Sequence, residues 1–136
     1  MTPSGHDADA ATAAARDPRI RIVVAGTVLP ATLADSAAAR AFAAMLPLDC
    51  SLADFHATEK IADLPARLPT DDAPHGVDAA SGDIAYYAPW GNLALFYRDF
   101  GHARGLVRLG RITGDVAVLA SPGPLPARIE RVTPAD

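Results

Sequence analysis

Aromatic residues gather in the second half of the 136-residue sequence, where six of the eight lie, and they are side chains well suited to binding chemistry. Trp90, the only tryptophan, falls in a turn signal, and Tyr86 and Phe96 fall in the segments on either side of it. Several aromatic rings on one hairpin would offer a stacking platform for a small ligand or a peptide. Arg108 could hold a carboxylate through two parallel hydrogen bonds, and His56 could act beside an acidic residue. These five residues form the predicted ligand-binding surface.

A structural role is the competing interpretation for the same residues. The tyrosines and Phe96 could fill a core instead of facing a ligand. Residues 49–83 contain eight acidic side chains against two basic ones, and arginines follow at 98, 104, 108 and 111. We therefore expect the acidic and basic regions to pair across the fold. The alternative is that Arg108 or Arg111 binds an anionic ligand.

The sequence contains no catalytic or metal-binding motif. Its four histidines lack metal-ligand spacing, and there is no nucleophile elbow, phosphate-binding loop or dinucleotide fingerprint. His56 could still form an acid–base pair with Asp54 or Glu59, or a weak metal site with Asp71 and Asp72. We therefore assign no catalytic residue, no metal and no cofactor.

Lysine and cysteine each occur once. Lys60 is expected on a solvated surface beside Glu59. Cys50 lies in an alternating run and is interpreted as a small strand residue. A single cysteine cannot form an intramolecular disulfide, so we expect a cytoplasmic protein.

Composition excludes several classes of protein. The length favours one domain, and a net charge of −4 argues against binding to nucleic acid through phosphate neutralisation. No apolar run approaches the roughly 18–20 residues that span a bilayer, so no membrane association is expected. Residues 1–17 lack Val, Ile, Leu and aromatic residues, which predicts a disordered tail before a domain at 18–136.

Most of that domain is predicted to form short strands. The twelve prolines exclude a helical bundle, but an alanine-rich helix is expected over 37–46, with Asp35 or Ser36 as N-cap and Pro47 as its end. Gly110 indicates a bulge or a close backbone approach. Many short strands and one helix favour a small β-barrel. Strands are predicted at 19–24, 27–33, 83–88, 93–97, 106–112 and 127–132, an irregular loop at 65–82, and a strand or a helical turn at 115–120.

The order of these elements resembles the bacterial and archaeal cyclophilin-like proteins over about residues 19–132. The segments that carry the resemblance include 31–33, 35–40, 46–48, 59–60, 64–69, 82–84, 93–97 and 109–112. It implies a closed eight-stranded β-barrel capped by one or two short helices, the second of them at 115–120.

The resemblance also implies where prolyl isomerase residues would lie, since true cyclophilins catalyse that reaction. Ala57 stands where their arginine follows a Phe-His pair, Leu106 stands in place of their pocket histidine, and Gly101 in place of their tryptophan. Phe96 is the residue that could replace a pocket aromatic. The resemblance therefore points to a cyclophilin-like domain that lacks the isomerase constellation.

We predict a non-catalytic cyclophilin-like domain that binds a small molecule or a peptide beside the barrel. One alternative is a rewired prolyl isomerase that uses Phe96 with Arg108. Another is a structural module that forms homo-oligomers through the alanine-rich helix or a strand edge. Convergence of His56, Glu59, Lys60 and Arg108 on one concavity with the aromatic residues would favour binding, and their dispersal would favour the oligomer.

Overall fold

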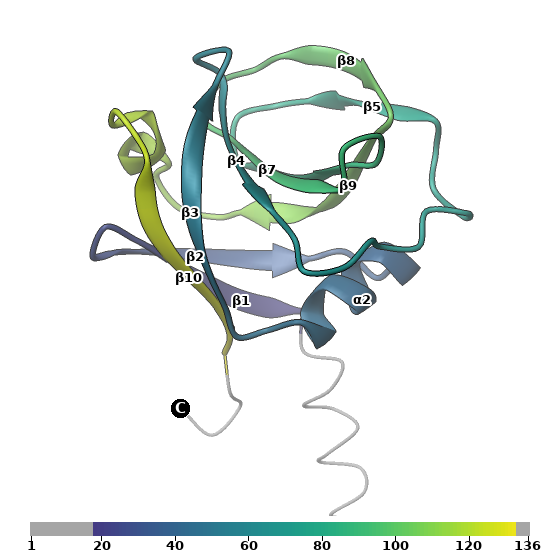
Figure 1. Cartoon of the computed structure of the whole chain (residues 1–136), viewed down its shortest axis with the longest axis horizontal. Helices are drawn as coiled ribbons and strands as arrows, with labels where there is room; N and C mark the ends of the chain where they lie inside the picture. The colour runs from purple at the N-terminus through teal and green to yellow at the C-terminus, as the bar shows by residue number, and fades with distance from the viewer. Residues whose placement is uncertain (1–17, 133–136) are drawn as a thin grey trace, which may run out of the picture.

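The computed structural model describes residues 18–132, and the predicted tail at 1–17 lies outside them. Eight strands close into an antiparallel barrel in the order β1-β10-β3-β4-β7-β6-β9-β2 (Figure 1). The predicted closed eight-stranded barrel is therefore confirmed. Its strands are β1 (Arg19–Val24), β2 (Thr27–Leu33), β3 (Leu48–Phe55), β4 (Glu59–Asp63), β6 (Asp83–Tyr87), β7 (Asn92–Phe96), β9 (Leu106–Ile112) and β10 (Leu125–Arg131).

Alternation along each strand sends every second side chain into the barrel. In β1, Ile20, Ile22 and Val24 are buried, whereas the arginines between and before them lie nearer the surface. In β7, Leu93 and Leu95 join this interior core. Burial of each such side chain contributes about 1.5–3 kcal/mol, so the interior core provides most of the driving force for folding.

The helix α2 (Ala37–Ala44) ends two residues earlier than predicted. Its N-cap is Ser36, whose Oγ accepts a hydrogen bond from the amide of Ala39 at 3.1 Å. Phe42 is fully buried and belongs to the interior core, so the apolar face of α2 closes part of the barrel (Figure 1). The segment at 115–120, which could have been a strand, contains the 3-10 helix η1 (Ala117–Ala120), as the resemblance implied.

The predicted bulge and the predicted close approach at Gly110 are both present. The pairing of β6 with β9 shifts between Ile84 and Ala85, which leaves an extra residue in β9 next to Gly110. A Cβ atom at Gly110 would lie 2.1 Å from the carbonyl oxygen of Thr32 in the neighbouring β2. Glycine is therefore required at position 110, where the backbones of β9 and β2 lie in close contact.

A second, two-stranded sheet lies outside the barrel. It consists of β5 (Gly76–Ala79) and β8 (Gly101–Arg104), which pair antiparallel (Figure 1). The loop predicted at 65–82 is therefore wrong for the residues that form β5. The strand β8 was not predicted either, because four-residue strands carry too little periodicity. The residues beneath this ribbon form a separate outer core of Ala79, Ala85, Ala94, Phe96 and Leu106. None of the helices in residues 18–132 is long and apolar enough to cross a bilayer.

Candidate functional site

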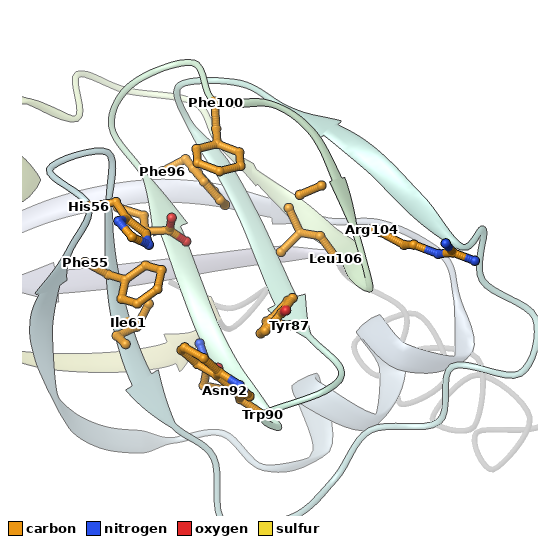
Figure 2. A pocket seen from close by; sticks show the side chains of 12 residues that line it. Phe55, His56, Ile61, Tyr87, Trp90, Asn92, Phe96, Phe100, Arg104 and Leu106 are labelled. Carbon is orange, nitrogen blue, oxygen red and sulfur yellow. The ribbon is translucent and has the colours of Figure 1, made fainter.

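A pocket of about 320 Å³ lies on the outer face of the barrel, where the outer core meets the β5–β8 ribbon. The strands β4, β6 and β7 form its floor, the turn after β3 forms one side and β8 forms another. Figure 2 shows the side chains converging on this space from several directions. The lining residues are Phe55, His56, Glu59, Ile61, Tyr87, Trp90, Asn92, Phe96, Phe100, Ala103, Arg104 and Leu106.

Aromatic rings form most of the walls (Figure 2). Trp90 stands nearly perpendicular to both of its neighbours, with its ring centroid 5.5 Å from Phe55 and 5.3 Å from Tyr87. Phe96 and Phe100 form a second pair, with centroids 6.2 Å apart. Trp90 and Phe100 are 59% and 46% exposed, so apolar surface remains uncovered at the mouth of the pocket.

Two buried polar side chains face this aromatic environment. Glu59 is 6% exposed, and its carboxylate accepts a 3.3 Å hydrogen bond from the hydroxyl of Thr58. Burial raises the pKa of Glu59 above its ordinary value, and the bond from Thr58 opposes this shift. The amide nitrogen of Asn92 donates to the carbonyl of Leu93 at 3.1 Å, whereas its Oδ1 is buried without a hydrogen-bond partner in residues 18–132.

His56 reaches the pocket from the turn between β3 and β4. His56 and Ala57 both adopt positive φ, at 55°, in the left-handed region that non-glycine residues rarely occupy. The turn places the imidazole against Phe55, with ring centroids 4.0 Å apart. Backbone strain of this kind costs of order 1–3 kcal/mol per residue and is concentrated at binding and catalytic sites.

Three of the five predicted binding residues line one pocket, namely His56, Trp90 and Phe96. Tyr86 does not, because alternation in β6 points it into the interior core and turns Tyr87 outward. The hydroxyl of Tyr86 accepts a hydrogen bond from the amide of Leu68 at 3.2 Å. The placement of Tyr86 on the binding surface is therefore corrected to Tyr87.

Arg108 is also absent from the pocket lining, because its guanidinium is bound by a carbonyl and a carboxylate of the acidic region. Its Nη2 donates to the carbonyl of Asp78 at 2.6 Å and to the carboxylate of Asp83 at 3.1 Å. Arg111 binds the other oxygen of the same buried carboxylate at 3.0 Å. The predicted pairing of acidic and basic regions is confirmed here. Arg108 does not join Phe96 in the pocket, as the rewired isomerase would require.

The expectation of a solvated Glu59–Lys60 surface is wrong. Consecutive residues in β4 point to opposite faces, so Glu59 lines the pocket while Lys60 shares the inner face with Ala62. The Lys60 side chain is completely buried. Its Nζ binds the carboxylate of Asp54 and donates to the carbonyl of Ser121 at 2.7 Å. Of the four polar residues expected to converge, His56 and Glu59 therefore meet in the pocket.

The remaining lining residues were missed because strand registers were unknown. Phe55 and Ile61 flank a turn that the sequence does not mark with glycine, and Phe100 and Arg104 depend on the unpredicted β8. In residues 18–132, no three histidine, cysteine or acidic side chains come together as metal ligands. The weak metal site considered for His56 with Asp71 and Asp72 is thus not formed.

Comparison with known proteins agrees with this architecture. A family model described as the cyclophilin-like family matches residues 22–130, which include six of the barrel strands in whole, most of β10 and half of β1. The chain belongs to the cyclophilin-like family.

This membership is consistent with a solved structure of the same fold. The solution structure of a hypothetical protein from Archaeoglobus fulgidus is similar with a TM-score of 0.61 and 20% sequence identity, covering 85% of this chain and 95% of that one. No protein matches in a comparison with curated sequences. In this member of the cyclophilin-like family, Leu106 lines the pocket with an aliphatic side chain.

Proposed function

We propose that the protein is a non-catalytic cyclophilin-like domain that binds a small molecule or a peptide side chain in the outer pocket. The observation that carries the proposal is the cavity of about 320 Å³ enclosed by five aromatic rings. Its size, its apolar walls and its few inward polar groups are typical of ligand sites. The lone Cys50 supports a cytoplasmic location, because the chain cannot form an internal disulfide.

The geometry favours binding over the rewired isomerase. Polarising a prolyl amide needs a donor aimed at the reacting nitrogen. Arg108 is held by Asp78 and Asp83, and Arg104 is exposed at the pocket rim and points away from the aromatic rings (Figure 2). Binding without turnover is therefore the better account of this site.

The oligomerising role is less well supported, because the alanine-rich helix and the edges of the barrel strands are already used. Closure of the barrel pairs each of its eight strands on both sides. The buried residues of α2 pack into the interior core instead of forming an exposed apolar face.

A compound screen on the full chain tests the binding proposal. Small apolar metabolites and proline-containing peptides would be screened by thermal shift and by the fluorescence of Trp90, the only tryptophan. Ala103→Phe places a ring in the pocket, and Ala53→Phe makes the same change at an exposed site on β3. We expect at least one compound to raise the Tm and to change the Trp90 emission, with both effects lost in Ala103→Phe and retained in Ala53→Phe. A screen without a hit, or binding that survives in a folded Ala103→Phe variant, would contradict the proposal.

A further inference from the structure

The buried polar groups of the pocket are both hydrogen-bond acceptors. Of the buried polar or charged side chains in residues 18–132, Glu59 and Asn92 line the pocket. The amide orientation of Asn92 is set by its nitrogen, which donates to the carbonyl of Leu93 and leaves Oδ1 without a partner. Oδ1 of Asn92 is fully enclosed, and Asn92 lies opposite Asp63 whereas Glu59 lies opposite Phe96, so Glu59 is the acceptor that a ligand in the pocket can reach.

In residues 18–132, no cation forms an ion pair with the Glu59 carboxylate. Its hydrogen bond comes from the neutral hydroxyl of Thr58, and the adjacent Lys60 points to the other face of β4 and binds Asp54. A buried carboxylate that lacks a positive partner is strongly disfavoured. A cationic ligand would supply the positive partner that the described residues do not provide.

The surrounding rings favour positive charge as well. The faces of Trp, Tyr and Phe attract cations through their quadrupoles, best of all where water is excluded. Trp90 is set nearly perpendicular to Phe55 and to Tyr87, so ring faces are turned toward more than one side of the space (Figure 2). Aromatic walls and a buried acid are the complement of an alkylated cation that carries N–H groups.

Resting on the function proposed above, we propose that the pocket selects an organic ammonium ion, a protonated amine on a short apolar chain. The ammonium group donates to Glu59, and the apolar chain contacts the aromatic rings. Arg104, the fixed cation among the lining residues, is exposed at the rim and points away from these rings, so it leaves the inner part of the pocket to the ligand's charge (Figure 2).

Three probes with the same branched skeleton test the sign of the recognised charge. They are 3-methylbutylammonium, the neutral 3-methylbutan-1-ol and the anionic 3-methylbutanoate, each titrated against the full chain at constant ionic strength. The indole N–H signal of Trp90 and its fluorescence report binding. We expect the ammonium ion to bind at least about tenfold more tightly than the alcohol, and the carboxylate to bind most weakly, because a charge-assisted hydrogen bond is roughly twice as strong as a neutral one.

A variant at Glu59 assigns the effect to this residue. Glu59→Gln should reduce the affinity for the ammonium ion to that for the alcohol. Asp63→Asn is the matched control, because Asp63 lies exposed on the same strand. It should leave the affinities for all three probes unchanged.

The outcomes separate this inference from the function on which it rests. If the three probes bind equally well, or if Glu59→Gln keeps the preference for the cation, the inference is overturned although the pocket binds ligands. Preference for the carboxylate would overturn it in favour of anion recognition. If none of the probes binds, the inference is overturned, and the compound screen with Ala103→Phe decides independently whether the pocket has another ligand.

Discussion

Glu59 and Lys60 are neighbours in β4, yet the barrel wall separates their charges. Glu59 faces the outer pocket, and Lys60 is enclosed on the inner face, where it binds Asp54 and the carbonyl of Ser121. An opposite charge one residue away therefore provides no contact partner for the acid. The same strand thus supplies a structural cation to the barrel and an unpaired acid to the candidate site.

The stability of the protein is expected to depend on pH through Glu59. Burial raises the pKa of Glu59 in the folded state, so the folded chain holds this proton more tightly than the unfolded chain does. The free energy of unfolding should fall as pH rises from 4.5, the ordinary pKa of a glutamate, to the raised pKa of Glu59. Above the raised pKa this contribution should level off. Urea titrations across that range would measure it. The fall should be smaller in Glu59→Gln than in Asp63→Asn, and identical slopes in both variants would contradict the assignment.

Replacing Lys60 should destabilise the barrel. Lys60→Met keeps much of the volume but leaves the carbonyl of Ser121 without its donor, and it removes the partner of Asp54. Because the Asp54 side chain is 49% exposed and can be hydrated, we expect a loss of about 1–3 kcal/mol rather than the larger cost of stranding a buried charge. Chemical denaturation measures this loss. A variant as stable as the wild type would show that the buried amine contributes nothing net.

Gly110→Ala is expected to be among the most damaging single changes. Its Cβ atom would lie 2.1 Å from the backbone oxygen of Thr32, so β2 and β9 must separate. Overpacking typically costs 1–3 kcal/mol, and a clash with backbone should cost about 3 kcal/mol or more. Gly114→Ala is the control, because its Cβ atom would lie 3.3 Å or more from neighbouring side-chain atoms. Equal Tm values for the two variants would refute the explanation.

The turn at His56 and Ala57 should be stabilised by glycine. Ala57 has a φ of 55°, which glycine adopts without the penalty of a Cβ atom. We expect Ala57→Gly to raise the free energy of unfolding by about 0.5–1 kcal/mol, because relief of strain exceeds the added entropy of the unfolded chain. Ala53→Gly, in the regular part of β3, should have the opposite sign. Denaturant midpoints compare them, and a loss of stability in Ala57→Gly would contradict the strain.

Prolyl isomerase activity is not expected. A protease-coupled assay with an Ala-Pro peptide should give the uncatalysed rate, because the guanidinium of Arg108 is engaged by Asp78 and Asp83 outside the pocket. Ala103→Phe serves as the control for any residual rate. Acceleration that disappears in this pocket-filling variant would establish catalysis at the site and overturn the non-catalytic proposal.

Sequence patterns predicted six of the eight barrel strands, and the resemblance to a known family implied the closed barrel. They indicated β3 only through the alternating run at Cys50, and they missed β4. They were insufficient for the pocket, because its lining depends on which side chains of each strand face outward and on a short outer ribbon. Tyr86 and Tyr87 are chemically equivalent in the sequence, and the pairing of β6 with its neighbours decides which one faces outward. Likewise, the burial of Lys60 could not be predicted, since its partners Asp54 and Ser121 lie in other elements of the chain.

The interior core and the outer core share no residue. The ribbon that covers the outer core is tied to the barrel by polar contacts such as the hydrogen bond from Arg108 to the carbonyl of Asp78. Mutations that reshape the pocket can therefore accumulate without disturbing the packing that holds the barrel closed. We expect relatives with this arrangement to diversify in what they recognise far more readily than in how they fold.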